Sequence, residues 1–217
     1  MLSQNAEKYI GAIYRISDAG EPVGLSALSE WLSVSRVSVN EMIRKLEKDG
    51  LVMYTPYRGV SLTPTGESQA LDIVRRHRTW ERFLVDVMAM PWDQAHEEAC
   101  ELAHATSASL LEQLSEFLGQ PETCPHGHAV PSPNGEIVEE RGRPLGELAS
   151  GQTAVVLRVP EEEPGMLTYL NQLGLRPGVS VSVQDVAPFD GPVTLYVEGT
   201  QRAIGRKLAS RIIVRVS

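Results

Sequence analysis

The chain has 217 residues, a formal net charge of −8 and two cysteines. At about 100 to 200 residues per domain, this length fits one large domain or two to three small ones. Two cysteines exclude a secreted scaffold built on disulfides, and the sequence has neither an apolar run long enough to cross a bilayer nor a hydrophobic amino-terminal stretch. We therefore expect a cytoplasmic protein, and its acidity argues at first sight against nucleic acid as a partner.

The charge is distributed unevenly along the chain. Residues 1–82 carry eleven Lys or Arg and ten Asp or Glu, whereas residues 83–140 carry eleven Asp or Glu and no Lys or Arg. Residues 83–140 also contain both cysteines and four of the five histidines. A solvated acidic face would explain the carboxylates alone. Carboxylates, imidazoles and thiols together, with no cation to pair with them, are also the composition of a metal site.

Three helices and a hairpin are predicted at the start of the chain. Apolar residues at helical spacing predict helices over 9–20, 25–32 and 39–50. A tight polar turn separates the second helix from the third, and two short strands joined by a turn follow over 51–62. This order is typical of a winged helix-turn-helix, so we assign residues 1–66 to a DNA-binding domain.

The middle of the chain is predicted to be helical. A long helix over 64–90 starts with a capping hydroxyl before a proline, and further helices are expected over 93–104 and 107–118. Each has an apolar stripe, and small helical modules usually bury such a stripe against a partner. We therefore expect a homodimer and assign residues 67–140 to a helical dimerisation and metal-binding domain with a loop.

The remainder is predicted to be mostly β. Proline and glycine interrupt residues 119–144, and a helix is expected over 166–173. Short β-branched runs occur at 153–159, 179–186, 193–197 and 212–216. These runs indicate a small β-barrel or sandwich over residues 145–217, which makes the whole chain α+β and mainly helical.

Metal-binding side chains recur at helical spacing on two consecutive predicted helices. They are His77 and Glu81 on the first helix, and His96, Glu97, Cys100, Glu101 and His104 on the second. Residues four apart project from one side of a helix, so two antiparallel helices could supply four or more ligands to one or two ions. A single histidine or cysteine on a helix is more often a packed core residue, but two complementary sets favour a metal site.

A second set of donors lies in the loop that follows. Proline favours an extended conformation in the residue before it, so Cys124 and His126 can point the same way and chelate one ion. Glu161 could complete this site, although a charged loop tip is an equal explanation. Carboxylate, imidazole and one thiolate favour Mn²⁺ or Fe²⁺, for which Zn²⁺, Co²⁺ or Cd²⁺ can substitute.

The helix-turn-helix also supplies candidate DNA contacts. Early residues of the second helix reach base edges, and flanking cations hold phosphates. The base-contact candidates are Ser35, Arg36, Val37, Ser38, Asn40 and Glu41, and the phosphate candidates are Arg44, Lys45, Lys48, Tyr57 and Arg58. Arg36 could read guanine and Asn40 adenine. A solvated helix face is the alternative explanation for the cations at positions 44, 45 and 48.

The order of these parts resembles the diphtheria toxin repressor family of metal-dependent transcriptional regulators. The most specific stretches are residues 47–52, 62–66, 77–82, 96–100 and 173–178, the last of which is similar to the family's SH3-like, FeoA-like domain. The resemblance implies a manganese- or iron-responsive repressor rather than an enzyme. It also implies an ancillary metal site of His77, Glu81, His96, Cys124 and His126, with an acidic residue near Glu161, and a primary site containing Cys100 and His104.

The primary site departs from the family pattern at two positions. The family has a carboxylate where this chain has Ala103, and a methionine or aspartate ligand where it has Lys8. Glu101 and Glu7 are the nearest replacements. If they do not replace the missing ligands, the ancillary residues alone would sense metal. The cysteine of the primary site resembles the one found in iron-responsive members of the family. The Cys-x-His loop resembles that of manganese-responsive members. Of the two metals, we favour manganese.

The predicted function is metal-dependent binding to operator DNA. A divalent ion would order the dimer for binding and neutralise part of the acidic segment, which otherwise repels a phosphate backbone. Two alternatives remain at this point: a winged-helix regulator that needs no metal, and a metalloenzyme. The second would need a nucleophile beside an open metal position, and the nearby Ser107 and Ser109 suit helix termini better.

Overall fold

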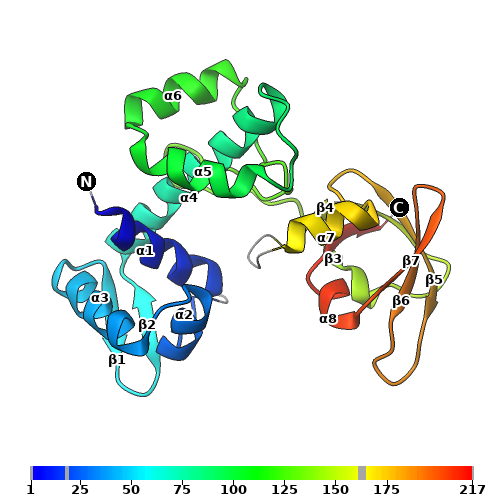
Figure 1. Ribbon diagram of the computed structural model, residues 1–217, viewed down its shortest axis with the longest axis horizontal. Helices are drawn as coiled ribbons and strands as arrows, with labels where there is room; N and C mark the ends of the chain where they lie inside the picture. The colour runs from blue at the N-terminus through cyan, green and yellow to red at the C-terminus, as the bar shows by residue number, and fades with distance from the viewer. Residues whose placement is uncertain (1, 18–19, 161–164, 217) are drawn as a thin grey trace. The chain divides into compact units, whose positions relative to one another are not determined.

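The computed structural model describes residues 2–17, 20–160 and 165–216 (Figure 1). The chain divides into two compact units. The first contains residues 1–77, 103–106 and 131–136, and the second contains residues 78–102, 107–130 and 137–217. Each unit is described by itself below.

The first unit contains the predicted three helices and hairpin. They are α1 (Gln4–Ile16), α2 (Leu25–Trp31), α3 (Arg36–Lys48), β1 (Val52–Thr55) and β2 (Gly59–Leu62). The hydroxyl of Ser35 caps α3 by accepting a hydrogen bond from the backbone N–H of Ser38, as a helix N-cap does. Ile10, Leu28 and Ile43, from the three helices, are buried in one core. The winged helix-turn-helix is therefore confirmed.

A glycine fixes the hairpin where its turn meets strand β2. Residues of β1 and β2 pair antiparallel, from Val52 opposite Leu62 to Thr55 opposite Gly59. Gly59 has a φ of +125°, and a Cβ at this position would lie 2.3 Å from the carbonyl oxygen of Val23. Only glycine permits both the conformation and this close backbone approach. The hairpin is thereby held next to the segment that precedes α2.

Helix α4 (Pro64–Asp86) begins in the first unit and continues into the second. Its start was predicted correctly, because the hydroxyl of Thr63 accepts a hydrogen bond from the backbone N–H of Gly66. Its end was predicted four residues too late, since the chain leaves the helix after Asp86 and Ala89 has a φ of 53°. None of the helices among the described residues is long and apolar enough to span a membrane.

Two further helices belong mainly to the second unit. They are α5 (Ala95–Ala105), which starts two residues later than predicted, and α6 (Ala108–Phe117), which Ser107 caps. A small core joins Leu84 of α4 to Ala95 and Ala99 of α5. Ala95 and Ala99 are one turn apart on α5, so they form one small apolar face that packs in this core.

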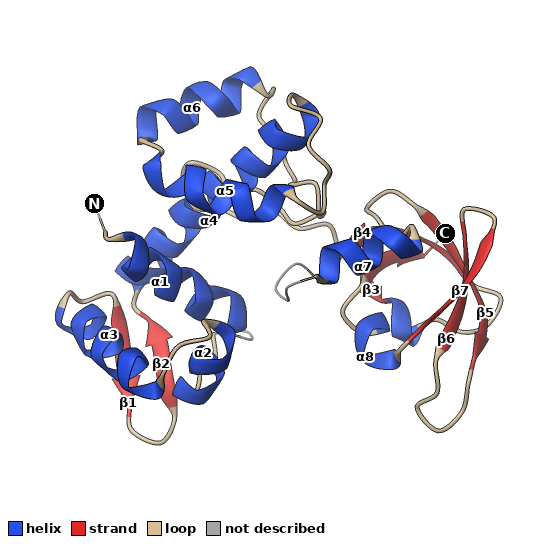
Figure 2. Cartoon of the chain, viewed as in Figure 1, coloured by secondary structure: helices blue, strands red, loops and turns tan. Residues whose placement is uncertain are grey.

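The carboxy-terminal part of the second unit is a single antiparallel sheet with short helices (Figure 2). Its elements are β3 (Arg143–Pro144), the 3-10 helix η1 (Leu145–Glu147), β4 (Thr153–Arg158), α7 (Met166–Leu173), β5 (Ser180–Val186), β6 (Val193–Val197), β7 (Thr200–Ile204), α8 (Arg206–Ala209) and β8 (Ile213–Val216). The strand order is β3-β8-β4-β5-β6-β7. Sequence periodicity missed β7 and α8, because β7 is largely polar and α8 is a single turn. The predicted fold class, α+β and mainly helical, is confirmed.

Candidate metal centre and DNA-reading surface

Three predicted ligands meet in the second unit. Glu81 lies on α4, His96 on α5 and His126 in the loop after α6, and their ligand atoms lie within 4.8 Å of one another. Nδ1 of His96 lies 2.9 Å from Oε1 of Glu81, and Nδ1 of His126 lies 3.3 Å from the same oxygen. The side chains of Glu81 and His126 are fully buried. A buried carboxylate beside two imidazoles is a donor set that suits a divalent transition metal.

The hydrogen bonds of His126 set its tautomer. Nε2 lies 2.9 Å from the backbone carbonyl oxygen of Trp92, and since a carbonyl only accepts, Nε2 donates. In the neutral ring, Nδ1 then carries the lone pair and faces Glu81. The Sγ atom of Cys124 lies 4.0 Å from this Nδ1. The structure therefore brings the sulfur of Cys124 and the Nδ1 atom of His126 close together, and their binding of one ion stays a prediction.

Two arginines of α4 hold the Cys-x-His loop. Arg78 donates to the carbonyl oxygen of Ala129 at 2.5 Å, and Nε of Arg82 donates to that of Thr123 at 2.7 Å. These residues bracket Cys124 and His126, so the same helix that carries Glu81 also fixes the loop ligands. This role was not predicted from the sequence. The sequence shows that Arg78 and Arg82 are spaced to lie on one side of a helix. It does not show which loop carbonyls these arginines bind.

The loop is also fitted closely against strand β4. The backbone N–H of Gly127 donates to the carbonyl of Cys124 at 2.9 Å, which closes a tight turn. Gly127 has a φ of +89°, and a Cβ there would lie 1.9 Å from the carbonyl oxygen of Leu157. On the other side of the turn, Nε2 of His128 donates to the carbonyl of Val159 at 2.9 Å. These contacts fix the conformation of the loop, so its two ligands are held in place before an ion binds.

The other predicted ligands are placed as follows along α4 and α5. His77 is buried on α4, one helical turn before Glu81, and Cys100 is partly buried on α5, one turn after His96. Glu101 is exposed on α5. Glu161 lies outside the described residues.

His104, which was grouped with Cys100 in the predicted primary site, has a defined partner in the first unit. Its Nδ1 lies 2.8 Å from Oε2 of Glu7 on α1. The other oxygen of Glu7, Oε1, accepts a hydrogen bond of 2.9 Å from Arg76 on α4. Glu7 therefore lies next to His104 of the predicted primary site, as the sequence suggested. It is also paired with the guanidinium of Arg76.

The predicted DNA contacts lie on the solvent-exposed surface of the first unit. All eleven are exposed: Ser35, Arg36, Val37, Ser38, Asn40, Glu41, Arg44, Lys45, Lys48, Tyr57 and Arg58. The residues between them on α3, Val39, Ile43 and Leu46, are buried. Helix α3 thus presents its polar side to solvent. Three of the candidate side chains are engaged locally. Nδ2 of Asn40 donates to the carbonyl of Arg36 at 3.0 Å, and the hydroxyls of Ser35 and Ser38 lie 2.9 Å apart.

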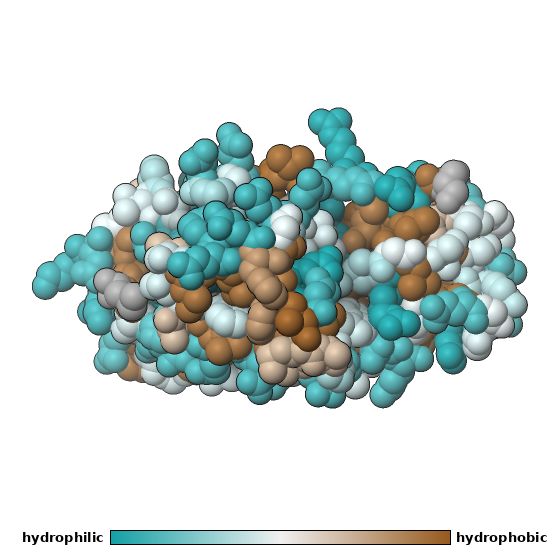
Figure 3. All heavy atoms as spheres, turned by 90° about the horizontal axis from the view of Figure 1, so that it is seen from above, coloured by the Kyte–Doolittle hydropathy of each residue, from teal (hydrophilic) through white to brown (hydrophobic). Residues whose placement is uncertain are grey.

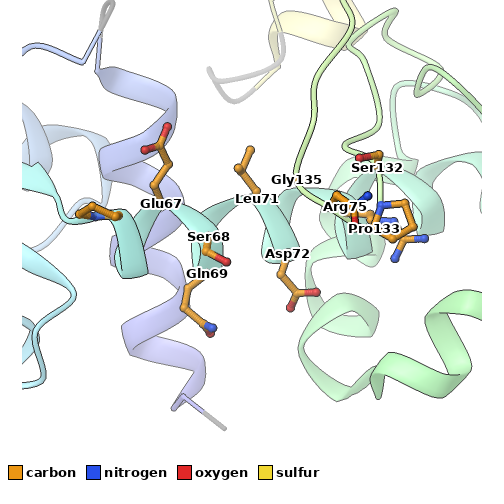
Figure 4. Close-up of a pocket in the computed structure, with 11 residues that line it drawn as sticks. Glu67, Ser68, Gln69, Leu71, Asp72, Arg75, Ser132, Pro133 and Gly135 are labelled. Carbon is orange, nitrogen blue, oxygen red and sulfur yellow. The ribbon is translucent and has the colours of Figure 1, made fainter.

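A hollow elsewhere in the first unit lacks metal-binding chemistry. It lies between α4 and the loop 131–136 (Figure 4). Glu67 and Leu71 extend to one side of α4 and Asp72 to the other, while Pro133 lies near Arg75. Neither histidine nor cysteine is among the residues that line it. This hollow therefore does not compete with the Glu81 group as a transition-metal site.

Comparison with known families matches the three parts of the chain in order. The family described as "Iron dependent repressor, N-terminal DNA binding domain" matches residues 1–60. "Iron dependent repressor, metal binding and dimerisation domain" matches residues 63–132, and the FeoA domain matches residues 143–216. The FeoA match agrees with the predicted SH3-like carboxy-terminal domain.

Whole-chain relatives are of the same kind. The chain is 31% identical over 214 residues to the iron-dependent repressor IdeR of Mycobacterium tuberculosis, covering 91% of this chain and 90% of that protein. It is 30% identical over 172 residues to the diphtheria toxin repressor of Corynebacterium glutamicum, covering 79% and 74%. Both relatives are named as repressors, not as enzymes.

Solved structures agree with the sequence relatives. A manganese-dependent transcriptional repressor in complex with manganese has a TM-score of 0.87 and 31% identity, covering 98% of this chain and 100% of that chain. The structure of ScaR with bound Cd²⁺ has a TM-score of 0.85 and 28% identity, covering 97% and 99%. The chain therefore belongs to the diphtheria toxin repressor family of iron- and manganese-dependent transcriptional repressors.

Proposed function

We propose that this protein binds operator DNA as a homodimer when it holds a divalent metal ion, and that the ion is Mn²⁺ in the cell. The observation that carries the proposal is the buried Glu81, His96 and His126 group, with Cys124 beside it. Relatives named for iron and for manganese support a first-row divalent ion. The carboxylate and the limited sulfur content favour Mn²⁺ over a softer ion. Like its operator DNA, the protein would be cytoplasmic.

We propose that His77 and Cys100 extend this group. His77 precedes Glu81 by one turn of α4, and Cys100 follows His96 by one turn of α5, so each lies on the side of its helix that bears a grouped ligand. Glu161 would contribute from the carboxy-terminal domain. Glu101 is a weaker candidate because it is exposed. The bound ion would be coordinated by the carboxylate, imidazole and thiolate ligands and would hold them together by its positive charge.

Operator binding would use the exposed polar side of α3 and the hairpin. Arg36 is placed at the start of α3, where a helix-turn-helix reads bases, and Asn40 would have to release the carbonyl of Arg36 to read adenine. Arg44, Lys48 and Arg58 would hold phosphates. The domain limits of 1–66, 67–140 and 145–217 remain a prediction.

The dimer interface would lie on the helical domain. Large apolar side chains are exposed just after α4 and along α6, namely Val87, Met88, Leu110 and Phe117. The space-filling view shows apolar patches between hydrophilic side chains on the surface (Figure 3). Exposed apolar residues in a small helical module are typical of a subunit interface.

The test is selection of random duplex DNA by the purified protein, with and without Mn²⁺. Enrichment of a shared, near-palindromic sequence only when Mn²⁺ is present would support the proposal. Equal enrichment in the presence of a chelator would contradict it. The variant His126→Ala should lose the metal effect, whereas Glu98→Gln, on the exposed side of α5, should keep it.

A further inference from the structure

A guanidinium fills the place where the family resemblance puts the primary metal ion. Nη1 of Arg76 donates to the carbonyl of Ala103 at 2.7 Å, and Nη2 donates to Oε1 of Glu7 at 2.9 Å. Ala103 is one of the two positions where the family pattern is broken, and Glu7 directly precedes the other, Lys8. Arg76 is 6% exposed.

The surrounding groups complete an ion-pair network within the first unit, in which Arg76 and Glu7 are buried and Asp72 and His104 are partly exposed. Oε2 of Glu7 lies 2.8 Å from Nδ1 of His104, so both carboxylate oxygens are engaged. Nε of Arg76 lies 3.1 Å from Oδ2 of Asp72, one turn earlier on α4. The network thereby joins α1, α4 and the end of α5. Glu7 itself is 7% exposed.

These residues do not fit a second divalent ion. Arginine stays protonated at every accessible pH and its nitrogens only donate, so Arg76 cannot be a ligand. A divalent ion bound by Glu7 and His104 would face this buried positive charge at contact distance, where like charges repel strongly. Lys8 is exposed and Ala103 has no donor in its side chain. Of the two residues that could have replaced the missing ligands, Glu7 is instead paired with Arg76, and Glu101 is exposed on α5.

We propose that Arg76 is a built-in cation that replaces the metal ion of the family's primary site. The Glu7–Arg76–His104 network then connects the DNA-reading helices to α4 and α5 whether or not metal is present. The protein consequently takes one divalent ion per protomer, at the Glu81 group, and that ion alone makes operator binding metal-dependent. This inference rests on the proposed function for its link to DNA, but the number of ions is measured without DNA.

The first experiment counts bound Mn²⁺ by equilibrium dialysis and elemental analysis of the full-length protein. The unaltered protein and the Glu7→Gln variant should each bind one ion per protomer, and Glu81→Gln should bind none. Lys8→Ala, next to Glu7 but exposed, is the matched control and should also bind one. Two ions in the unaltered protein, or loss of an ion in Glu7→Gln, would overturn the inference.

The second experiment asks what Arg76 does for the fold and for DNA binding. Arg76→Met should lower the melting temperature of the metal-free protein and weaken operator binding of the Mn²⁺-loaded protein by at least about tenfold, with one ion still bound. Arg76→Lys should have a higher melting temperature and a higher operator affinity than Arg76→Met, because lysine keeps the positive charge. An Arg76→Met protein with unchanged operator affinity would contradict the network's role. If Arg76→Met does not fold, Glu7→Gln gives the same readouts.

The two proposals fail in different ways. An unaltered protein that binds no Mn²⁺, or that binds operator equally with a chelator, would refute the proposed function. An unaltered protein that binds two ions and needs them for DNA would leave the proposed function intact and refute the role of Arg76.

Discussion

Oε1 of Glu81 lies within 3.3 Å of Nδ1 of His126, and both side chains are fully buried. Helix α4 supplies the carboxylate, and the loop after α6 supplies the imidazole. A carboxylate with no exposure is costly unless it is paired, so the buried position itself indicates that Glu81 has a charged or hydrogen-bonded partner in the working protein. In this arrangement Nδ1 of His96, 2.9 Å from Oε1 of Glu81, is that partner. A metal ion between the same groups would pair with the carboxylate more strongly and would also bind the lone pair on Nδ1 of His126.

Glu81→Gln should weaken Mn²⁺ binding by a factor of at least about 10 to 100, because an amide keeps the shape of the side chain but not the negative charge that binds a cation. Isothermal titration of the purified variant with Mn²⁺ measures the change. Glu98→Gln, exposed on α5, removes one negative charge from the same segment and serves as control. If the two variants lose affinity equally, the effect is one of total charge and Glu81 is not a ligand.

Arg78→Met should lower Mn²⁺ affinity by about 10-fold without removing any ligand, because Arg78 holds the carbonyl of Ala129 and so the loop that bears His126. The matched control is Arg143→Met, an arginine that is half exposed and pairs with Glu147 at the surface. Titration with Mn²⁺ and thermal melting of both variants separate a loss of site geometry from a loss of stability. An Arg78→Met protein with normal Mn²⁺ affinity would show that the loop orders itself without this arginine.

The helices and the wing could be predicted because their signals are local. Apolar spacing, the hydroxyl of Thr63 before Pro64, and the glycine that ends α7 at Gly174 all act within a few residues. The end of α4 and the strand β7 were missed because tertiary pairing decides them. Strand β7 is polar along most of its length and is stabilised mainly by its ladder with β6.

The residue types of the candidate site could be predicted from the sequence, but the residues that pair with them could not. Residues 83–140 contain no Lys or Arg, which suggested carboxylates without cations. The cations come from α4 instead, where Arg78 and Arg82 bind the loop and Arg76 binds Glu7. Composition counted along the chain cannot show which side chains a neighbouring helix supplies. The sequence did identify Glu7 as a residue near the primary site, but its pairing with Arg76 required the structure.

Gly127→Ala should destabilise the protein, because the added Cβ would meet the carbonyl of Leu157 and the residue has a φ of +89°. The free energy of unfolding should fall by about 1 to 3 kcal/mol. Mn²⁺ affinity should fall as well, because the added atom would shift the loop that carries Cys124 and His126. Gly119→Ala is the matched control, because Gly119 has a φ of +75° with nothing within 4 Å of the added atom. It should cost only about 1 kcal/mol, from backbone strain alone. Equal melting temperatures for the two variants would argue against a close fit between the loop and β4.

Arg36→Ala and Arg44→Ala should affect DNA binding in different ways, because the two residues occupy different positions on α3. Arg36 is the first residue of the helix, and Arg44 lies two turns later on its exposed side. A base contact contributes discrimination of about 1 to 3 kcal/mol at one position of the operator, whereas a phosphate contact contributes affinity that is independent of sequence.

Loss of Arg36 should therefore relax the sequence preference at one position of each half-site, as measured by repeating the random-DNA selection with the Mn²⁺-loaded variant. Loss of Arg44 should leave the selected sequence unchanged and reduce the slope of log affinity against log salt concentration by about 1. Glu67→Gln, exposed on α4 away from α3, provides the control for a change of one charge. If the Arg44 variant selects a different sequence, or the Arg36 variant changes only the salt slope, then α3 is oriented on DNA differently from the helix-turn-helix arrangement that we propose.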